Sequence, residues 1–138
     1  MSIHSLNEDW TDIYYFLHYD HKENLTHQNI RCLQTIEKNS KVTVQAVTNR
    51  MGISHNTASE HIKRLIQKGY IKKYKGEKDK RVVYLELTAL GKGALEKNTE
   101  LDKEKLKIIL EKLNEEQCSQ IYNAFELLKK AAKHEFPR

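Results

Sequence analysis

Residues 53–91 carry the signals of a helix, a turn and a basic β-hairpin in direct succession, and this stretch restricts the possible fold most strongly. Ser54 is a residue type that caps helix starts, and Ile53 before it can pack onto Ala58 one turn later. Gly69 suits the left-handed position that ends a helix. Between these limits, apolar residues recur at spacings of four and three and predict one buried stripe: Ala58, Ile62 and Leu65.

The opposite face of this helix is polar, and most of its side chains are short. A surface helix held only by water usually carries long charged side chains on such a face. Asparagine, serine and glutamate near a helix N-terminus are instead suited to hydrogen bonds with base edges. The pattern therefore favours a recognition helix, with the polar residues His55, Asn56, Ser59, Glu60 and Lys63 on its outer side.

A basic β-hairpin is predicted after Gly69, because two aromatic and β-branched runs flank the polar stretch 75–81. Asp79 stands two residues before Arg81, so its carboxylate can hold the guanidinium in a bidentate pair and stiffen it for a DNA minor groove. A plain solvated turn is the alternative. Many cations on one ribbon repel each other unless a polyanion lies nearby; here they are Lys72, Lys73, Lys75, Lys78, Lys80 and Arg81.

The hairpin contains an Asp-x-Arg motif and is closed by a Leu-Thr-x-x-Gly motif at Leu87, Thr88 and Gly91. These motifs follow, in order and at compatible distances, the positions Thr57, Ala58, Ile62, Leu65, Gly69 and Ile71. The arrangement resembles the MarR family of winged helix-turn-helix regulators. The resemblance implies a second helix over residues 25–39, the first helix of the DNA-binding pair over residues 44–52, and dimerisation helices from residue 89 onward.

The resemblance also implies how such a protein works. Members of the family are homodimers that bind pseudo-palindromic operators as repressors, or less often as activators, and they respond to a small-molecule effector or an oxidant. We expect base-edge contacts from Asn56, Ser59, Glu60 and Lys63. Ser54 would lie at the helix start, and His55, Thr57 and Arg64 would face phosphates or the edge of the groove. For the last three, a role in the helix start or in packing of the DNA-binding lobe is an equal alternative. The expected wing residues are Lys78, Asp79, Lys80 and Arg81.

Positive charge is concentrated in the same segment. The chain has a formal net charge of +5, but residues 40–93 carry twelve lysines and arginines against four acidic residues, a net charge of +8. Residues 1–39 carry −3, and residues 94–138 are neutral. Phosphate neutralisation with counterion release supplies much of the sequence-independent affinity for DNA, so double-stranded DNA is the expected partner. A basic helix that binds membranes would show Trp or Phe beside its cations, whereas the hairpin's expected strand core is Tyr70, Val83, Leu85 and Leu87.

A single mainly α-helical domain with a small β-hairpin wing is expected from 138 residues that include only five glycines and one proline. The winged-helix DNA-binding lobe would span residues 25–93, and helical dimerisation regions would span residues 1–24 and 94–138. Thr88 can cap a long helix that runs to Leu113, and Asn114 with Gln117 can cap another.

The helices outside the basic lobe carry apolar stripes, including one that recurs at helical spacing from Ile3 to Leu17. A monomer of this size cannot easily bury all of them. Burial between two copies would solve this, and a two-fold homodimer also matches a palindromic DNA site.

The N-terminal helix holds the candidates for effector binding, because its aromatic and histidine side chains could border an organic-ligand pocket: Trp10, Tyr14, Tyr15 and His18. A metal site at His18 and His21 is the alternative, since this spacing places two imidazoles on one helical side. Zinc-sensing members of the family draw further histidines from the helix after the wing, and residues 89–133 contain none. No metal or other cofactor is therefore expected.

The two cysteines are interpreted mainly as packing residues. Cys32 stands beside apolar residues on a predicted helix and reads as a small buried hydrophobe, with a sensor role as the alternative. Cys118 lies in the first turn of a helix, where the dipole lowers a thiol pKa, but also on an apolar face, which raises it. Its redox activity therefore stays open. The tyrosines of the N-terminal helix have no cysteine near them in the sequence, unlike those of peroxide-sensing members of the family.

Other classes of function find little support in the sequence. No Gly-x-Gly-x-x-Gly, Gly-x-Ser-x-Gly or Cys-x-x-Cys motif occurs, so an enzyme is not expected. The absence of a signal peptide and of an eighteen-residue apolar run predicts a cytoplasmic protein without a membrane partner. The main alternative is a winged-helix adaptor that binds protein or RNA without operator specificity.

Overall fold

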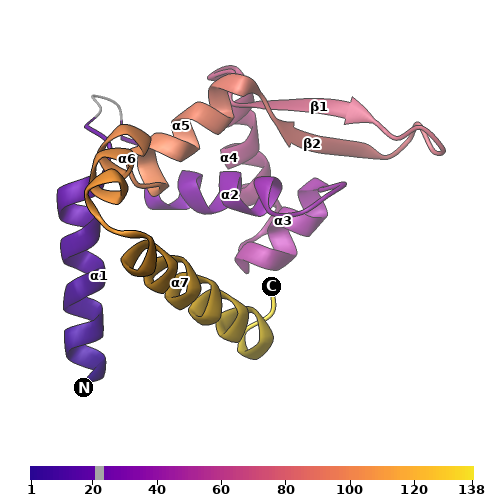
Figure 1. Cartoon of the computed structure of the whole chain (residues 1–138). Coiled ribbons are helices and arrows are strands. Elements are labelled where there is room, and N and C mark those ends of the chain that lie inside the picture. The colour runs from indigo at the N-terminus through magenta and orange to yellow at the C-terminus, as the bar shows by residue number, and fades with distance from the viewer. Residues whose placement is uncertain (21–23) are drawn as a thin grey trace. The chain divides into compact units, whose positions relative to one another are not determined.

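The computed structural model describes residues 1–20 and 24–138, and in this part of the chain it contains seven helices and one antiparallel hairpin (Figure 1). The elements are α1 (Ile3–Leu17), α2 (His27–Glu37), α3 (Val44–Met51), α4 (His55–Gln67), β1 (Ile71–Lys75), β2 (Val83–Leu87), α5 (Ala89–Thr99), α6 (Lys103–Lys112) and α7 (Glu115–Glu135). The prediction of a mainly helical chain with a small hairpin wing is confirmed.

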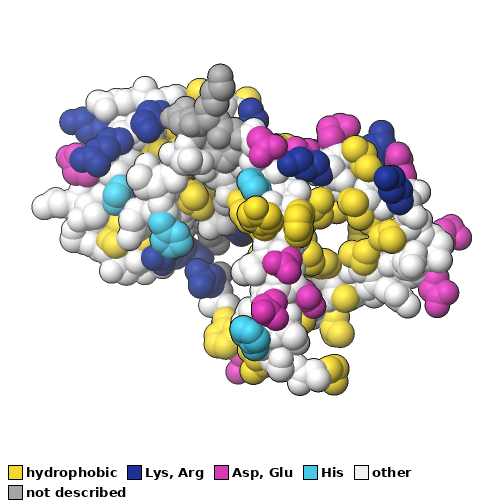
Figure 2. All heavy atoms as spheres, turned by 90° about the vertical axis from the view of Figure 1, so that its left-hand side faces the viewer, with side chains coloured by type: hydrophobic (Ala, Val, Ile, Leu, Met, Phe, Trp, Pro, Cys, Tyr) yellow, Lys and Arg dark blue, Asp and Glu magenta, His cyan; other side chains and the backbone are white. Residues whose placement is uncertain are grey.

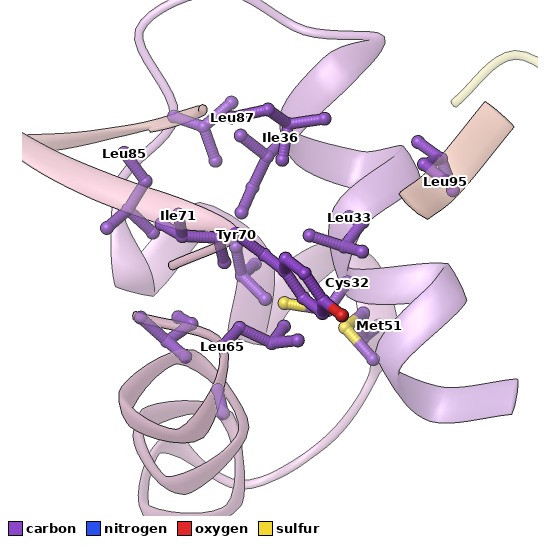
Figure 3. Close-up of a cluster of buried hydrophobic side chains, with 14 of the residues drawn as sticks. Cys32, Leu33, Ile36, Met51, Leu65, Tyr70, Ile71, Leu85, Leu87 and Leu95 are labelled. Atoms are coloured by element: carbon purple, nitrogen blue, oxygen red, sulfur yellow. The ribbon is translucent and has the colours of Figure 1, made fainter. Parts of the chain in front are cut away.

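Two compact units make up the chain: Tyr19–Glu100 is one, and Met1–His18 together with Leu101–Arg138 is the other. The buried hydrophobic core of the described residues lies wholly in the first unit. Helices α2, α3, α4 and α5 and the base of the hairpin contribute to it (Figure 3). Its largest fully buried side chains are Leu33, Ile62, Leu65, Ile71, Leu95, Val42, Val47 and Cys32.

Hydroxyl and amide caps explain where the helices start. Thr26, Thr43, Ser54 and Thr88 each accept a hydrogen bond from a backbone N–H three residues later, at the starts of α2, α3, α4 and α5. At α7, Asn114 and Gln117 form the reciprocal capping box that the sequence predicts. Local hydrogen bonding thus sets the beginnings of these elements.

The hairpin pairs in one continuous register, from Ile71 opposite Leu87 to Lys75 opposite Val83. A third segment joins it, since the backbone N–H of Leu85 donates to the carbonyl oxygen of Val42 at 2.7 Å. Leu85 and Leu87 are buried as predicted, whereas Val83 is 40% exposed. The prediction that Val83 belongs to the strand core is wrong, because its pair lies at the end of the ladder beside the turn and beyond the packed helices.

The prediction of one long helix from Thr88 to Leu113 is also wrong. Helix α5 ends at Thr99, and α6 begins at Lys103. Between them, Asp102 acts as a new N-cap, and its carboxylate accepts from the backbone N–H groups of the two residues Glu104 and Lys105. The backbone N–H of Asp102 donates instead to the carbonyl oxygen of Leu17, at 2.7 Å. The helical hydrogen-bonding pattern is therefore interrupted at Asp102, and α5 and α6 are separate helices.

The second unit has no buried residue on its helices α1, α6 and α7. The first unit, by contrast, contains the buried core. Figure 2 turns the side on which α1 lies in Figure 1 toward the viewer and shows hydrophobic side chains gathered on that surface. The exposed large hydrophobic residues of the three helices are Ile3, Leu6, Trp10, Tyr15, Phe16, Ile108, Ile109, Ile121, Tyr122, Phe125, Leu127 and Leu128. In the described part of the chain, no helix is long and apolar enough to cross a membrane.

Candidate DNA-binding site

Helix α4 presents a polar face because its apolar stripe is held in the core. Ala58, Ile62 and Leu65 are each at most 2% exposed. Ser54 accepts a hydrogen bond from the backbone N–H of Thr57 at 3.1 Å, and its hydroxyl donates to the Thr57 hydroxyl at 2.8 Å. Core packing and the cap therefore fix both the rotation of α4 and its first turn.

The predicted contact residues of α4 share the opposite side of the helix. Ser59 is half-buried, and the exposed members of the set are Ser54, His55, Asn56, Thr57, Glu60, Lys63 and Arg64. The hydroxyl of Thr57 takes part in the cap, which is the helix-start role left open by the sequence. The others offer amide, carboxylate, imidazole and cationic groups to a partner outside the helix.

A shallow depression of about 260 Å³ lies on this face and is lined by Asn56, Thr57, Glu60, His61 and Arg64. His61 is half-buried and is absent from the set predicted from the sequence. Its spacing of four from Thr57 and three from Arg64 is the signal that identifies it, since residues three and four apart are neighbours on a helix surface. The polar face of α4 thus includes one more hydrogen-bonding side chain than predicted.

The end of the hairpin holds the second group of predicted residues. Arg81 donates from Nε to Oδ1 of Asp79 and from Nη2 to Oδ2 of Asp79, each at 3.1 Å, so the bidentate pair predicted from the sequence is present. The backbone N–H of Arg81 also donates to Asp79 Oδ1, at 3.0 Å. These side-chain and backbone hydrogen bonds from Arg81 hold the pKa of the Asp79 carboxyl below its usual range.

The pair orients Arg81 without burying it, because 91% of the Arg81 side chain is exposed. An exposed ion pair contributes little to stability, so the geometry matters here more than the attraction. Lys78 and Lys80 beside it are exposed as well. The turn of the hairpin therefore carries three cationic side chains open to a partner.

The MarR family model matches residues 25–83, which include α2, α3, α4, β1 and the turn of the hairpin. This match agrees with the winged-helix arrangement of the first unit. The winged-helix segment of this chain, residues 25–83, is of the MarR family. Transcriptional regulation through DNA binding is the role of this family, and its members generally are not enzymes.

Several solved structures share the fold of this chain. YusO of Bacillus subtilis is 26% identical, with 93% of this chain and 92% of that one covered and a TM-score of 0.59. MepR of S. aureus bound to ethidium bromide is 18% identical, with 93% and 92% covered and a TM-score of 0.63. FabT of Streptococcus pneumoniae in complex with DNA is 22% identical, with 96% and 99% covered and a TM-score of 0.56. A comparison with curated protein sequences finds no match.

The candidate effector residues lie on α1 and just after it. Tyr14 and His18 stack with ring centroids 5.5 Å apart, and both are half-buried. Trp10 and Tyr15 are 57% and 71% exposed. His21, named in the alternative metal site, lies outside the described residues, and those residues contain no group of three or more potential metal ligands.

The two cysteines lie in different environments. Cys32 is fully buried in the core (Figure 3), and burial raises the pKa of its thiol to about 12. Cys118 is half-buried, and its thiol donates to the carbonyl oxygen of Leu110 at 3.4 Å. The packing interpretation of Cys32 is confirmed.

Proposed function

We propose that this MarR-family protein is a homodimeric transcription regulator that binds a pseudo-palindromic operator and acts as a ligand-responsive repressor. The observation that carries the proposal is the presence, within one unit and one segment of net charge +8, of the polar face of α4 and the oriented Arg81 of the hairpin. The two elements offer complementary ways to hold a duplex. Phosphates supply affinity, and base edges supply specificity.

On this proposal, α4 lies in the major groove. The amide of Asn56 can pair with the N6 and N7 positions of adenine, and the carboxylate of Glu60 can accept from the N4 amino group of cytosine. Ser59 and Lys63 would reach neighbouring bases. Contacts from His55, Thr57 and Arg64 to phosphates would hold the helix in register, with Ser54 at its N-terminal end.

The hairpin would serve as the wing, with Arg81 in or along the adjacent minor groove and Lys78 and Lys80 near phosphates. An arginine suits a narrow minor groove because the negative potential is enhanced there. Asp79 would not touch DNA, since a carboxylate is repelled by phosphates. Its role would be to keep the guanidinium of Arg81 in one orientation.

Homodimerisation through α1, α6 and α7 follows from their exposed apolar residues. Monomeric proteins rarely expose large contiguous apolar patches. A further feature of this surface is an apolar hollow of about 360 Å³ along one face of α6, lined by Lys103, Leu106, Lys107, Leu110 and Glu111. We infer that a second copy covers these helices, that residues 1–24 and 94–138 form the dimerisation region, and that residues 25–93 form the DNA-binding lobe.

Two of the similar structures support parts of this proposal. FabT was solved in complex with DNA, and MepR was solved bound to ethidium bromide. By analogy, an aromatic or cationic effector would bind near the aromatic residues of α1, with Trp10, Tyr14, Tyr15 and His18 as its contacts. Effector binding would lower DNA affinity by favouring a different spacing of the two recognition helices.

The experiment that tests the proposal is selection of bound duplexes from a random pool by the full-length protein. The proposal predicts enrichment of two inverted half-sites whose centres are about one helical turn of DNA apart. A pool that shows no enriched sequence after repeated rounds would contradict it. Compounds that release the selected duplex would then identify the effector.

A further inference from the structure

The turn at the end of the hairpin, residues 76–82, is held by two backbone hydrogen bonds. The N–H of Gly76 donates to the carbonyl oxygen of Val82 at 2.9 Å, and the N–H of Val82 donates to the carbonyl oxygen of Asp79 at 3.2 Å. The backbone oxygen of Asp79 is thereby tied to the start of β2, while its carboxylate holds Arg81. The position of the Asp79 main chain sets where the carboxylate lies.

Gly76 is buried inside this turn, directly against the main chain of Asp79. A Cβ at Gly76 would lie 2.7 Å from the backbone oxygen of Asp79 and 3.2 Å from Cε2 of Tyr84. The first contact is shorter than real Cβ contacts, and a backbone atom cannot move aside as the end of a side chain can. The main chain of Asp79 would therefore have to shift.

The second neighbour of Gly76 is itself in contact with another aromatic ring. The ring of Tyr84 packs against that of Tyr74, its partner across the ladder, with centroids 5.5 Å apart. The φ angle of Gly76 is outside the left-handed region, which among the glycines is adopted by Gly52 and Gly69. Space, and not backbone conformation, is thus what position 76 requires of its residue.

We propose that Gly76 is a positioning residue for Arg81, because the absence of a side chain at this position lets the main chain of Asp79 close the turn and hold its carboxylate against the guanidinium. The proposal rests on the function proposed above for the wing. A side chain already held in its binding orientation loses less conformational entropy when it binds, so pre-orientation of Arg81 raises affinity. Gly76 therefore acts on DNA binding without touching DNA.

The first test measures the Asp79–Arg81 pair without DNA. Carboxyl NMR titrations of the full-length protein would compare the wild type, Gly76→Ala and the control Gly93→Ala, whose added Cβ meets nothing within 4 Å. In the wild type and the control, the pKa of Asp79 should lie below its usual range, and in Gly76→Ala it should rise toward that range. An unchanged Asp79 pKa in Gly76→Ala would overturn the inference, whether or not the protein binds DNA.

The second test measures affinity for the selected duplex in a double-mutant cycle. Gly76→Ala should weaken binding roughly three- to tenfold, with an unchanged far-UV circular dichroism spectrum, and Gly93→Ala should bind like the wild type. In an Arg81→Ala background, Gly76→Ala should cause no further loss, because its effect passes through Arg81. Equal losses in the two backgrounds would overturn the inference.

The same cycle separates this inference from the proposed function. If Arg81→Ala itself leaves affinity unchanged, the wing contact fails and with it the functional consequence proposed for Gly76. If Arg81→Ala weakens binding and Gly76→Ala does not, the wing contact stands and the role of Gly76 is refuted.

Discussion

Gly91 on α5 lies so close to the backbone carbonyl of Tyr70 that a Cβ at position 91 would overlap the carbonyl oxygen. The same oxygen accepts a hydrogen bond from the backbone N–H of Thr88 at 3.0 Å, and the Thr88 hydroxyl donates to the carbonyl oxygen of Gly69. Backbone contacts thus join the start of α5 to the base of the hairpin. These contacts explain two positions of the Leu-Thr-x-x-Gly motif. Thr88 forms the hydrogen bonds to Tyr70 and Gly69, and Gly91 leaves room for the carbonyl oxygen of Tyr70.

Replacement of Gly91 by alanine should therefore lower the free energy of unfolding by about 1–3 kcal/mol, the usual effect of overpacking. Chemical denaturation followed by circular dichroism measures this value. Gly93→Ala is the matched control in the same helix, since its Cβ meets no atom within 4 Å. Equal unfolding midpoints for the two variants would show that the close approach at Gly91 is not needed.

Arg81→Ala should weaken binding to the selected duplex by about 1–3 kcal/mol and reduce the salt dependence of binding by about one charge. Asp79 holds the exposed guanidinium of Arg81 in position. Because this side chain is exposed, Arg81→Ala removes a proposed DNA contact and does not disturb the packed core. Lys97→Ala on α5 removes one exposed charge outside the proposed interface and controls for net charge. Fluorescence anisotropy titrations at several salt concentrations measure both effects, and equal behaviour of the two variants would remove the wing from the interface.

Cys32 should resist thiol reagents in the folded protein. It is fully buried, and with a thiol pKa raised to about 12 it carries almost no thiolate at pH 8, so both access and reactivity are low. The variant Cys118→Ser leaves Cys32 as the single thiol for a colorimetric assay. Labelling should become fast only after denaturant is added; fast labelling of the native variant would contradict the burial of Cys32.

The raised pKa of Cys32 also predicts a pH dependence of stability. A thiol whose pKa is higher in the folded than in the unfolded state contributes stability fully below the unfolded value, and this contribution falls as pH rises toward about 12. The labelling experiment is therefore best made near pH 8, where the folded state keeps this contribution.

Leu128→Asp should convert a dimer into a monomer, because it places a charge within the exposed apolar surface of α7. Sedimentation equilibrium of the wild type should give twice the chain mass of 16.3 kDa. Lys130→Asp, an exposed position on the opposite side of α7 from Leu128, should leave the dimer intact. A wild-type protein that sediments as a monomer at micromolar concentration would refute the proposed role of α1, α6 and α7.

Local signals in the sequence predicted much of the fold. The start of α4 at Ser54 and the capping box of α7 are hydrogen-bonding patterns that span only three residues, so the sequence contains all the information that they need. The Asp79–Arg81 pair is equally local, with two residues of separation. The buried stripe of α4 follows from spacing alone.

The features that the sequence does not predict depend on contacts between distant residues or on the space around a residue. The interruption between α5 and α6 involves a backbone hydrogen bond between Leu17 and Asp102, and no glycine or proline marks it in the sequence. Asp102 stands among charged residues, and the sequence pattern predicts this stretch as part of one helix. The space beside Gly76 depends on the path of the turn, which a residue pattern does not reveal, whereas His61 could have been found from its helical spacing.

The central claim is that α4 and the wing read a specific DNA sequence, and a competition titration tests it most directly. Fluorescence anisotropy would compare the selected inverted-repeat duplex with a scrambled duplex of the same composition over a range of salt concentrations. The account predicts affinity for the selected duplex roughly a thousandfold or more above that for the scrambled one, with a steep loss of affinity as salt rises. A ratio near one would contradict it and would favour an adaptor that binds protein or RNA.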